Sequence, residues 1–231
     1  MTDTIFIHPA EARRQFRDFA ARELGPSDLA RGSLLIALEE YPALDVEGSL
    51  AVLEQIATRV LAHASPGDPP VFLLGYLHSE MFDREGFSGD EVDYYDPRNS
   101  YLNEVLDRKL GLPITLSIIF MDLAQRIGLK AVGVGLPGHY LVKVQFDLNE
   151  LYVDPYHAGQ TLTLKEIDDL LSDMSRGRIR LKSEHLRGWT ERETLVRLLS
   201  NLKNAYARRG DARRAAFAQE RIDILAGDSP A

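Results

Sequence analysis

His139 and Asp154 are the two residues of this sequence best suited to acid–base or binding chemistry. His139 begins the stretch HYLVKVQF, which alternates like a strand, and Asp154 ends the next such stretch, LYVD. A carboxylate at the end of one strand can hydrogen-bond an imidazole on its neighbour and fix its tautomer, as a general base or a ligand-binding histidine requires. The same pair could instead clamp two strands together, and the residue types leave both interpretations open.

Ser117 is the candidate nucleophile, because the sequence contains no cysteine and so no thiol. Disulfides and zinc–thiolate sites are excluded for the same reason. Ser117 lies four residues after Pro113 in a predicted helix, on the same face and one turn deeper, whereas Thr115 points roughly the opposite way. With His139 and Asp154 it would form a Ser-His-Asp set. We expect instead a small buried serine whose hydroxyl bonds the Pro113 carbonyl.

No metal ion and no cofactor are expected from the sequence. His139, Asp154 and His157 could together supply ligands of the types that zinc accepts. Asp154 and His157 stand three residues apart beyond a strand end, however, and this spacing is not specific for metal binding. A metal site is therefore an alternative that the sequence does not favour.

A dense group of polar residues surrounds the helix predicted over residues 101–110. We expect this group to hold two helices together through caps and ion pairs, with ligand contacts from Asn99 and Asn103 as the alternative. Leu112 is a poor N-cap, so the helix that begins at Pro113 can leave backbone N–H groups free for an anion or a carbonyl oxygen. The group consists of Asp93, Asp96, Arg98, Asn99, Asn103, Asp107 and Arg108.

The candidate residues are expected on a buried helix and a small sheet. Residues 113–127 are apolar nearly all round, which is typical of a buried helix, and Gly111 has the position of a C′ residue after the preceding helix. Strand-like stretches cover residues 130–135, 139–146 and 151–154. Short sequential strands favour an antiparallel sheet packed on the buried helix, so the predicted fold class is α+β.

Alternation along the strand that begins at His139 gives it two unequal faces. Leu141 shares the face of His139, and the more apolar Tyr140, Val142 and Val144 lie on the other face. If His139 faces the buried helix, the more apolar face needs a second cover, for which the terminal helices are available.

Three segments are predicted: an N-terminal helical region over residues 1–90, a core over 91–162 and C-terminal helices over 163–231. The last two helices, over 191–208 and 212–225, are similar to a single tetratricopeptide-type hairpin. One such unit cannot form a solenoid, so we expect it to pack on the rest of the chain. The other predicted helices cover residues 8–24, 27–41, 47–64, 71–81 and 164–174.

The composition is that of an ordinary globular protein of 231 residues, 45% hydrophobic and 27% charged. Its formal net charge of −8 argues against binding to a nucleic-acid backbone, and the arginines near residue 210 are expected on solvated helix faces. No apolar run approaches the roughly 18 residues of a membrane span. The N-terminus lacks a signal-peptide pattern, so we expect a cytoplasmic protein.

Four stretches of the sequence stand out together: EEYPALDV (39–46), YYDPRNSYLNEVLDRKLGLPITLS (94–117), GVGLPGHYLV (133–142) and YVDPY (152–156). They resemble the bacterial SirB-type proteins of the transglutaminase-like superfamily. The resemblance implies an N-terminal helical region, a papain/transglutaminase-like core and C-terminal tetratricopeptide-like helices. Active members of the superfamily place a cysteine at the start of the core helix, a histidine at a strand start and an aspartate on the next strand. The histidine matches His139, the aspartate matches Asp154, and the cysteine position falls on Pro113, which cannot act as a nucleophile.

We therefore expect a pseudoenzyme, a non-catalytic binding or scaffold protein for a peptide or a small ligand. Protein partners are expected at the cleft or at the C-terminal helices, without nucleic acid or membrane. The alternative is a hydrolase or acyltransferase that uses Ser117, His139 and Asp154. A third possibility is a structural partner protein that works through its C-terminal helices alone. The candidate ligand-binding residues are Pro113, Thr115, Tyr140, Asn99 and Asn103.

Overall fold

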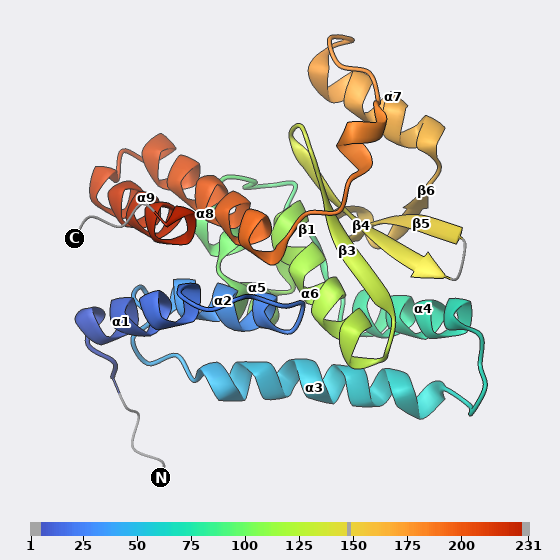
Figure 1. Cartoon of the computed structure of the whole chain (residues 1–231), viewed down its shortest axis with the longest axis horizontal. Helices are drawn as coiled ribbons and strands as arrows, with labels where there is room; N and C mark the ends of the chain where they lie inside the picture. The colour runs from blue at the N-terminus through green and yellow to red at the C-terminus, as the bar shows by residue number, and fades with distance from the viewer. Residues whose placement is uncertain (1–5, 147–148, 228–231) are drawn as a thin grey trace.

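Helix α6 (Pro113–Arg126) lies at the centre of the fold in the computed structural model, which describes residues 6–146 and 149–227. The N-terminal helices lie on one side of it and a four-stranded sheet on the other (Figure 1). Every residue of α6 from Pro113 to Ala124 is buried, as its all-round apolar sequence predicts. The helix therefore serves as the common core element for both halves of the chain.

Four α-helices form the N-terminal layer and bury their apolar faces. In the first of them, the residues Ala12, Phe16, Phe19 and Ala20 are buried, which is the stripe expected from helical periodicity. The fourth helix continues into a π-helical turn over Ser79–Arg84. None of the helices in the described part of the chain is both long and apolar enough to cross a membrane. The four are α1 (Pro9–Ala20), α2 (Asp28–Ala37), α3 (Val46–His63) and α4 (Pro70–His78).

The segment before α6 differs from its prediction at Gly111. Helix α5 (Leu102–Arg108) ends with Lys109 in the left-handed conformation, at φ 63°, so Lys109 and not Gly111 makes the turn. Gly111 instead belongs to β2 (Leu110–Gly111), which pairs in parallel with β1 (Ser88–Gly89). A Cβ on Gly111 would approach Val105 to 2.9 Å, so the glycine permits close packing rather than a helix end.

The sheet has the strand order β3-β4-β5-β6 with antiparallel neighbours, which confirms the α+β class. On β4, the residues Tyr140, Val142 and Val144 pack into the same core as α6, while Leu141 packs with Ile167 and Leu171 of α7 (Leu164–Ser175). The face of the sheet that carries His139 and Leu141 is thus covered by α7, and the face that carries Tyr140, Val142 and Val144 is covered by α6. The strands are β3 (Lys130–Leu136), β4 (His139–Phe146), β5 (Asn149–Asp154) and β6 (Gln160–Leu162).

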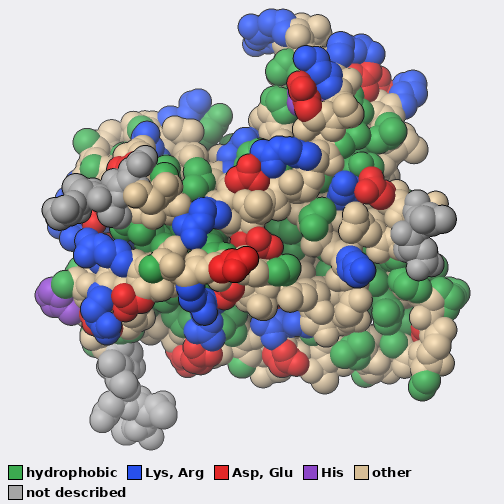
Figure 2. Space-filling model, in the orientation of Figure 1, with side chains coloured by type: hydrophobic (Ala, Val, Ile, Leu, Met, Phe, Trp, Pro, Cys, Tyr) green, Lys and Arg blue, Asp and Glu red, His purple; other side chains and the backbone are tan. Residues whose placement is uncertain are grey.

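Three 3₁₀ turns connect elements of the fold, and basic side chains gather at one end of the molecule. Two 3₁₀ turns, η3 (Pro155–His157) and η4 (Ser183–Leu186), follow β5 and α7, and a third, η2 (Pro97–Ser100), precedes α5. Figure 2 shows Lys and Arg side chains gathered around α7 and the segment after it, with acidic and basic side chains mixed over the rest of this face. The exposed basic residues of that segment are Arg176, Arg178, Arg180 and Lys182.

The C-terminal helices α8 (Glu191–Arg208) and α9 (Ala212–Ala226) form a hairpin whose bounds match the prediction closely. The buried leucines of α8 lie in the same apolar cluster as α1, α2 and α6. The hydroxyl groups of Tyr101 and Tyr206, 2.9 Å apart, join the segment before α5 to α8. The hairpin thus completes the main core of the protein. Those leucines are Leu195, Leu198, Leu199 and Leu202.

Candidate functional site

His139, Asp154 and His157 meet where β4 begins and β5 ends. The Nε2 atom of His139 lies 2.7 Å from Oδ2 of Asp154, so the hydrogen bond expected between the two strands is present. Nδ1 of His157 lies 2.8 Å from the same carboxylate oxygen. The side chains of His139 and Asp154 are almost fully buried, whereas that of His157 is 44% exposed. The cluster therefore has one open side, at His157.

The carboxylate of Asp154 is held in place by the turn that follows it. Its Oδ1 accepts hydrogen bonds from the backbone N–H groups of Tyr156 at 3.1 Å and His157 at 3.4 Å, which caps η3. Burial alone would raise the pKa of Asp154, but hydrogen bonds and charge interactions with His139 and His157 outweigh it and lower the pKa. The group is thus an anion at neutral pH, oriented with Oδ2 towards both imidazoles.

Tyr156 links this cluster to the loop that follows β1. Its ring meets the His139 ring edge-on, with centroids 6.1 Å apart, and its hydroxyl donates to the Asp90 carbonyl at 3.0 Å. A Cβ on Gly89 would approach the Tyr156 ring to 2.5 Å, so only glycine fits beneath it. Burial raises the pKa of Tyr156 to about 12, so it stays a neutral hydrogen-bond donor.

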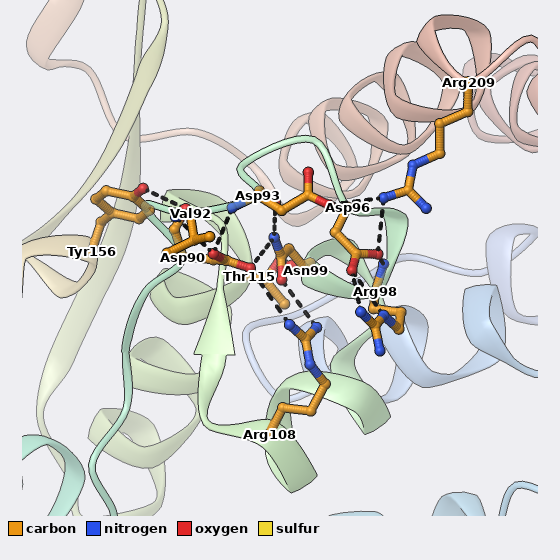
Figure 3. Close-up of polar contacts among 10 residues, drawn as sticks. All are labelled: Asp90, Val92, Asp93, Asp96, Arg98, Asn99, Arg108, Thr115, Tyr156 and Arg209. Atoms are coloured by element: carbon orange, nitrogen blue, oxygen red, sulfur yellow. Dashed lines mark hydrogen bonds and ion pairs between the residues drawn. The ribbon is translucent and has the colours of Figure 1, made fainter.

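The polar group before α6 forms a closed network around Asp90 and Asn99 (Figure 3). The amide nitrogen of Asn99 donates to Oδ2 of Asp90 at 3.0 Å and to the Asp93 carbonyl at 2.8 Å. Arg108 donates to the side-chain amide oxygen of Asn99 at 3.0 Å. The hydroxyl of Thr115 donates to the backbone carbonyl of Asn99 at 2.8 Å. Asn99 and Thr115 thus bond to protein groups that hold η2, α5 and α6 together.

Of the two other candidate residues, Tyr140 is buried and Asn103 is partly buried. The hydroxyl of Tyr140 is 2.7 Å from Oγ1 of Thr194, and its ring packs edge-on against Trp189. The side-chain oxygen of Asn103 is buried and has no hydrogen-bond partner in the described part of the chain. Tyr140 therefore fastens β4 to the start of α8.

Ser117 is fully buried within α6. Its hydroxyl has no hydrogen-bond partner among residues 6–146 and 149–227, so it bonds neither His139 nor the Pro113 carbonyl. Pro113 is buried as well. A helix that is apolar all round places its fifth residue in the core, where no substrate can reach it. Ser117 is therefore placed where it cannot act on a substrate in this conformation.

A pocket of about 650 Å³ lies where the start of α6 meets the turn before β4 and the side of α8. Leu112, directly before Pro113, and Gly138, directly before His139, are both part of its wall. Among the described residues, the remaining wall includes two arginines, two asparagines and two tyrosines, but no acidic residue. Its lining residues are Tyr94, Tyr95, Leu112, Gly138, Arg197, Asn201, Asn204, Ala205, Ala207 and Arg208.

The polar wall that α8 contributes was not predicted from the sequence. Arg197, Asn201, Asn204 and Arg208 follow one another at intervals of four, three and four residues, which places them on one helix face. That periodicity is visible in the sequence, but it is also typical of a solvated helix face. Only the fold shows that this face borders the start of α6.

Comparison with known proteins identifies relatives over most of the chain. A family model described as the transglutaminase-like superfamily matches residues 48–200. A UPF0162 protein of Xylella fastidiosa is 33% identical over 201 residues, which cover 86% of this chain and 72% of that protein. A UPF0162 protein of Pseudomonas aeruginosa is 28% identical over 205 residues, or 87% of this chain and 72% of that protein.

A more distant similarity covers part of the chain. The mouse F-box only protein 21 is 29% identical over 107 residues, which are 43% of this chain and 17% of that protein. No solved structure matches. Because the family model spans well over half of the sequence, and a relative of 33% identity aligns with most of it, this chain belongs to the transglutaminase-like superfamily.

Proposed function

We propose that this protein is a non-catalytic member of the superfamily that binds a carboxylate-bearing ligand in the 650 Å³ pocket. The observation that carries the proposal is the position of that pocket, between Leu112 and Gly138. These residues directly precede Pro113, where a nucleophile would stand, and His139. The ligand would thus lie where active members of the superfamily have their cysteine and histidine, although this sequence has no thiol there.

The chemistry of the wall favours an anionic ligand. Arg197 and Arg208 are the charged residues of the lining, and Asn201 and Asn204 add amide donors between them. The guanidinium of Arg208 stacks over the Tyr95 ring, with 3.9 Å to the centroid, which holds it in a defined position. Arginine binds carboxylates through two parallel hydrogen bonds, so an acidic peptide segment or a small carboxylate is the ligand class.

The finer assignments belong to the same proposal. We assign the protein to the SirB type, with the α8–α9 hairpin as a tetratricopeptide-like unit, a cytoplasmic location and partners at the pocket or the hairpin. The segments 1–90, 91–162 and 163–231 would then be the N-terminal region, the core and the C-terminal helices. A hydrolase or acyltransferase that uses Ser117 would require this buried hydroxyl to reach both His139 and solvent.

The proposal is tested by selecting ligands on the purified protein. We expect a random-peptide display library to be enriched in acidic peptides, and a panel of small di- and tricarboxylates to raise the melting temperature if the ligand is a free acid. Replacing either arginine, by Arg197→Gln or Arg208→Gln, should weaken binding of a selected ligand about tenfold, as loss of a charge-assisted hydrogen bond predicts.

The matched control is Arg178→Gln, which removes an exposed arginine outside the pocket lining. It should leave the affinity unchanged. The pocket proposal is wrong if neither acidic peptides nor carboxylates bind, or if the control weakens binding as much as the two pocket variants.

A further inference from the structure

Three metal-ligating side chains converge at the junction of β4, β5 and η3. His139, Asp154 and His157 each offer one ligand atom, and these atoms all lie within 4.8 Å of one another. We propose that this cluster binds a divalent transition-metal ion. The sequence did not favour such a site, because the spacing of Asp154 and His157 is not specific and His139 joins them only through the fold.

Two of the three separations between the ligand atoms are close to those around a bound ion, and the third is within 4.8 Å. Nε2 of His139 and Nδ1 of His157 lie 2.7 Å and 2.8 Å from Oδ2 of Asp154. Zinc–nitrogen and zinc–oxygen bonds are about 2.0–2.2 Å long, so ligand atoms around one ion stand roughly 3.0–3.5 Å apart. Opening the two contacts to the carboxylate by about half an ångström, with both imidazole nitrogens turned towards the same point, would convert the hydrogen-bonded cluster into a coordination site.

The two ends of the cluster differ in exposure, which leaves one side open for an ion to enter. The carboxylate of Asp154 is fixed by the backbone N–H groups of Tyr156 and His157, and the buried His139 ring packs against Tyr156. Outer contacts of this kind orient metal ligands. The side chain of His157 is 44% exposed, so it can swing to admit an ion from solvent. Coordination requires both imidazoles to carry their proton on the opposite ring nitrogen.

The ligand types define the class of ion. Two imidazoles and one carboxylate suit zinc, iron(II), cobalt(II) or nickel(II), whereas calcium and magnesium prefer oxygen ligands throughout. Three protein ligands leave at least one position for water or for a donor atom of a bound molecule. The inference is independent of the proposed ligand pocket, because Asp154 and His157 are not among the residues that line it.

The test is metal titration of the full chain after removal of bound ions with a chelator. We expect calorimetry with zinc chloride to show one equivalent bound by the wild type, and cobalt(II) to give the visible absorption bands of a protein-bound ion. His157→Ala should weaken zinc binding at least about tenfold and abolish those bands. Because His157 is the exposed ligand, this variant should keep its circular dichroism spectrum.

The matched control is His185→Ala, which removes a histidine of η4 outside the cluster. It should bind zinc like the wild type. The proposal is overturned if the wild type binds neither ion, if His157→Ala binds zinc as tightly as the wild type, or if His185→Ala causes the same loss.

Discussion

The hydroxyl of Ser117 is a polar group inside the apolar core. It is fully buried and has no hydrogen-bond partner in the described part of the chain. A buried hydroxyl without a partner destabilises a protein by about 1–3 kcal/mol, because it loses its hydrogen bonds to water. Ser33 offers a matched comparison, since it is equally buried but donates to the Leu29 carbonyl at 2.8 Å.

We therefore predict opposite effects of two identical substitutions. Ser117→Ala should raise the free energy of unfolding by about 1 kcal/mol, and Ser33→Ala should lower it by about 0.5–1.5 kcal/mol. Urea denaturation measures both. A fluorophosphonate probe should leave Ser117 unlabelled. Labelling of Ser117 would show an accessible, activated serine and would favour the hydrolase alternative over the proposed binding function.

At the scale of single residues, the sequence predicted the contact between His139 and Asp154 but not their surroundings. The pair was predictable because both residues stand at the ends of strands that are neighbours in sequence. His157 was named only in the metal alternative that the sequence did not favour, because the 3₁₀ turn that brings it to Asp154 leaves no periodic pattern. Arg197 was not singled out, because the helical spacing of the polar residues on α8 is also typical of a solvated face. The expected bond from Ser117 to the Pro113 carbonyl is absent, since sequence spacing does not fix a rotamer.

Helix α8 begins at a capping box that also carries an ion pair. The hydroxyl of Thr190 accepts from the backbone N–H of Glu193, whose carboxylate accepts from the backbone N–H of Thr190. Hydrogen bonds from Arg187 and Thr190 lower the pKa of Glu193 from its usual 4.5 to about 2, against a smaller opposing effect of burial. Because the folded pKa is the lower one, the stabilisation is complete above pH 4.5 and is lost as the pH falls towards 2.

This helix start predicts a pH-dependent effect of Glu193→Gln. The variant should be less stable than the wild type at pH 6, and the difference in unfolding free energy should shrink at pH 3, as the carboxyl of unfolded chains becomes protonated. Urea denaturation at the two pH values measures it. Glu191→Gln is the control, because it removes a charge from the same helical turn without breaking the capping box. An equal difference at both pH values would contradict the assignment.

At the scale of elements, helical periodicity and capping residues predicted the helices, but nothing in the sequence predicted the short strand pair. Helix α8 was predicted over residues 191–208, as observed, because an N-cap, an apolar stripe and a turn define it locally. The parallel pair β1–β2 was not predicted, because a strand of two residues is too short to show alternation. Each strand also forms only by pairing with residues 22 positions away in the sequence. Gly111 was assigned to a helix end for the same reason.

The whole molecule shares one main apolar core. Leu199 of α8 is fully buried in the cluster that also contains Phe16 of α1 and Ile118 of α6. Leu171 of α7 lies in a smaller second cluster on the far face of the sheet. The N-terminal region, the core segment and the C-terminal helices therefore depend on the same set of packing contacts.

This arrangement predicts a single unfolding transition. Leu199→Ala should lower the stability of the entire chain by about 2–5 kcal/mol, through lost burial and a cavity. The fluorescence of Trp189, the one tryptophan of the sequence, and the far-ultraviolet circular dichroism should shift together in denaturant. Leu164→Ala, at a leucine that is 53% exposed, is the control and should change little. Separate transitions would mean that the three segments fold independently.

Ion pairs join the N-terminal region to α9, so completion of the shared core also depends on the order in which the chain is synthesised. Glu39 pairs with both Arg13 and Arg221, and Glu40 pairs with Arg214. A ribosome releases the N-terminal helices long before α9, so part of their apolar surface stays exposed until α9 has been synthesised. We expect the nascent chain to stay sensitive to proteases, and to need chaperone shielding, until α9 has left the ribosome.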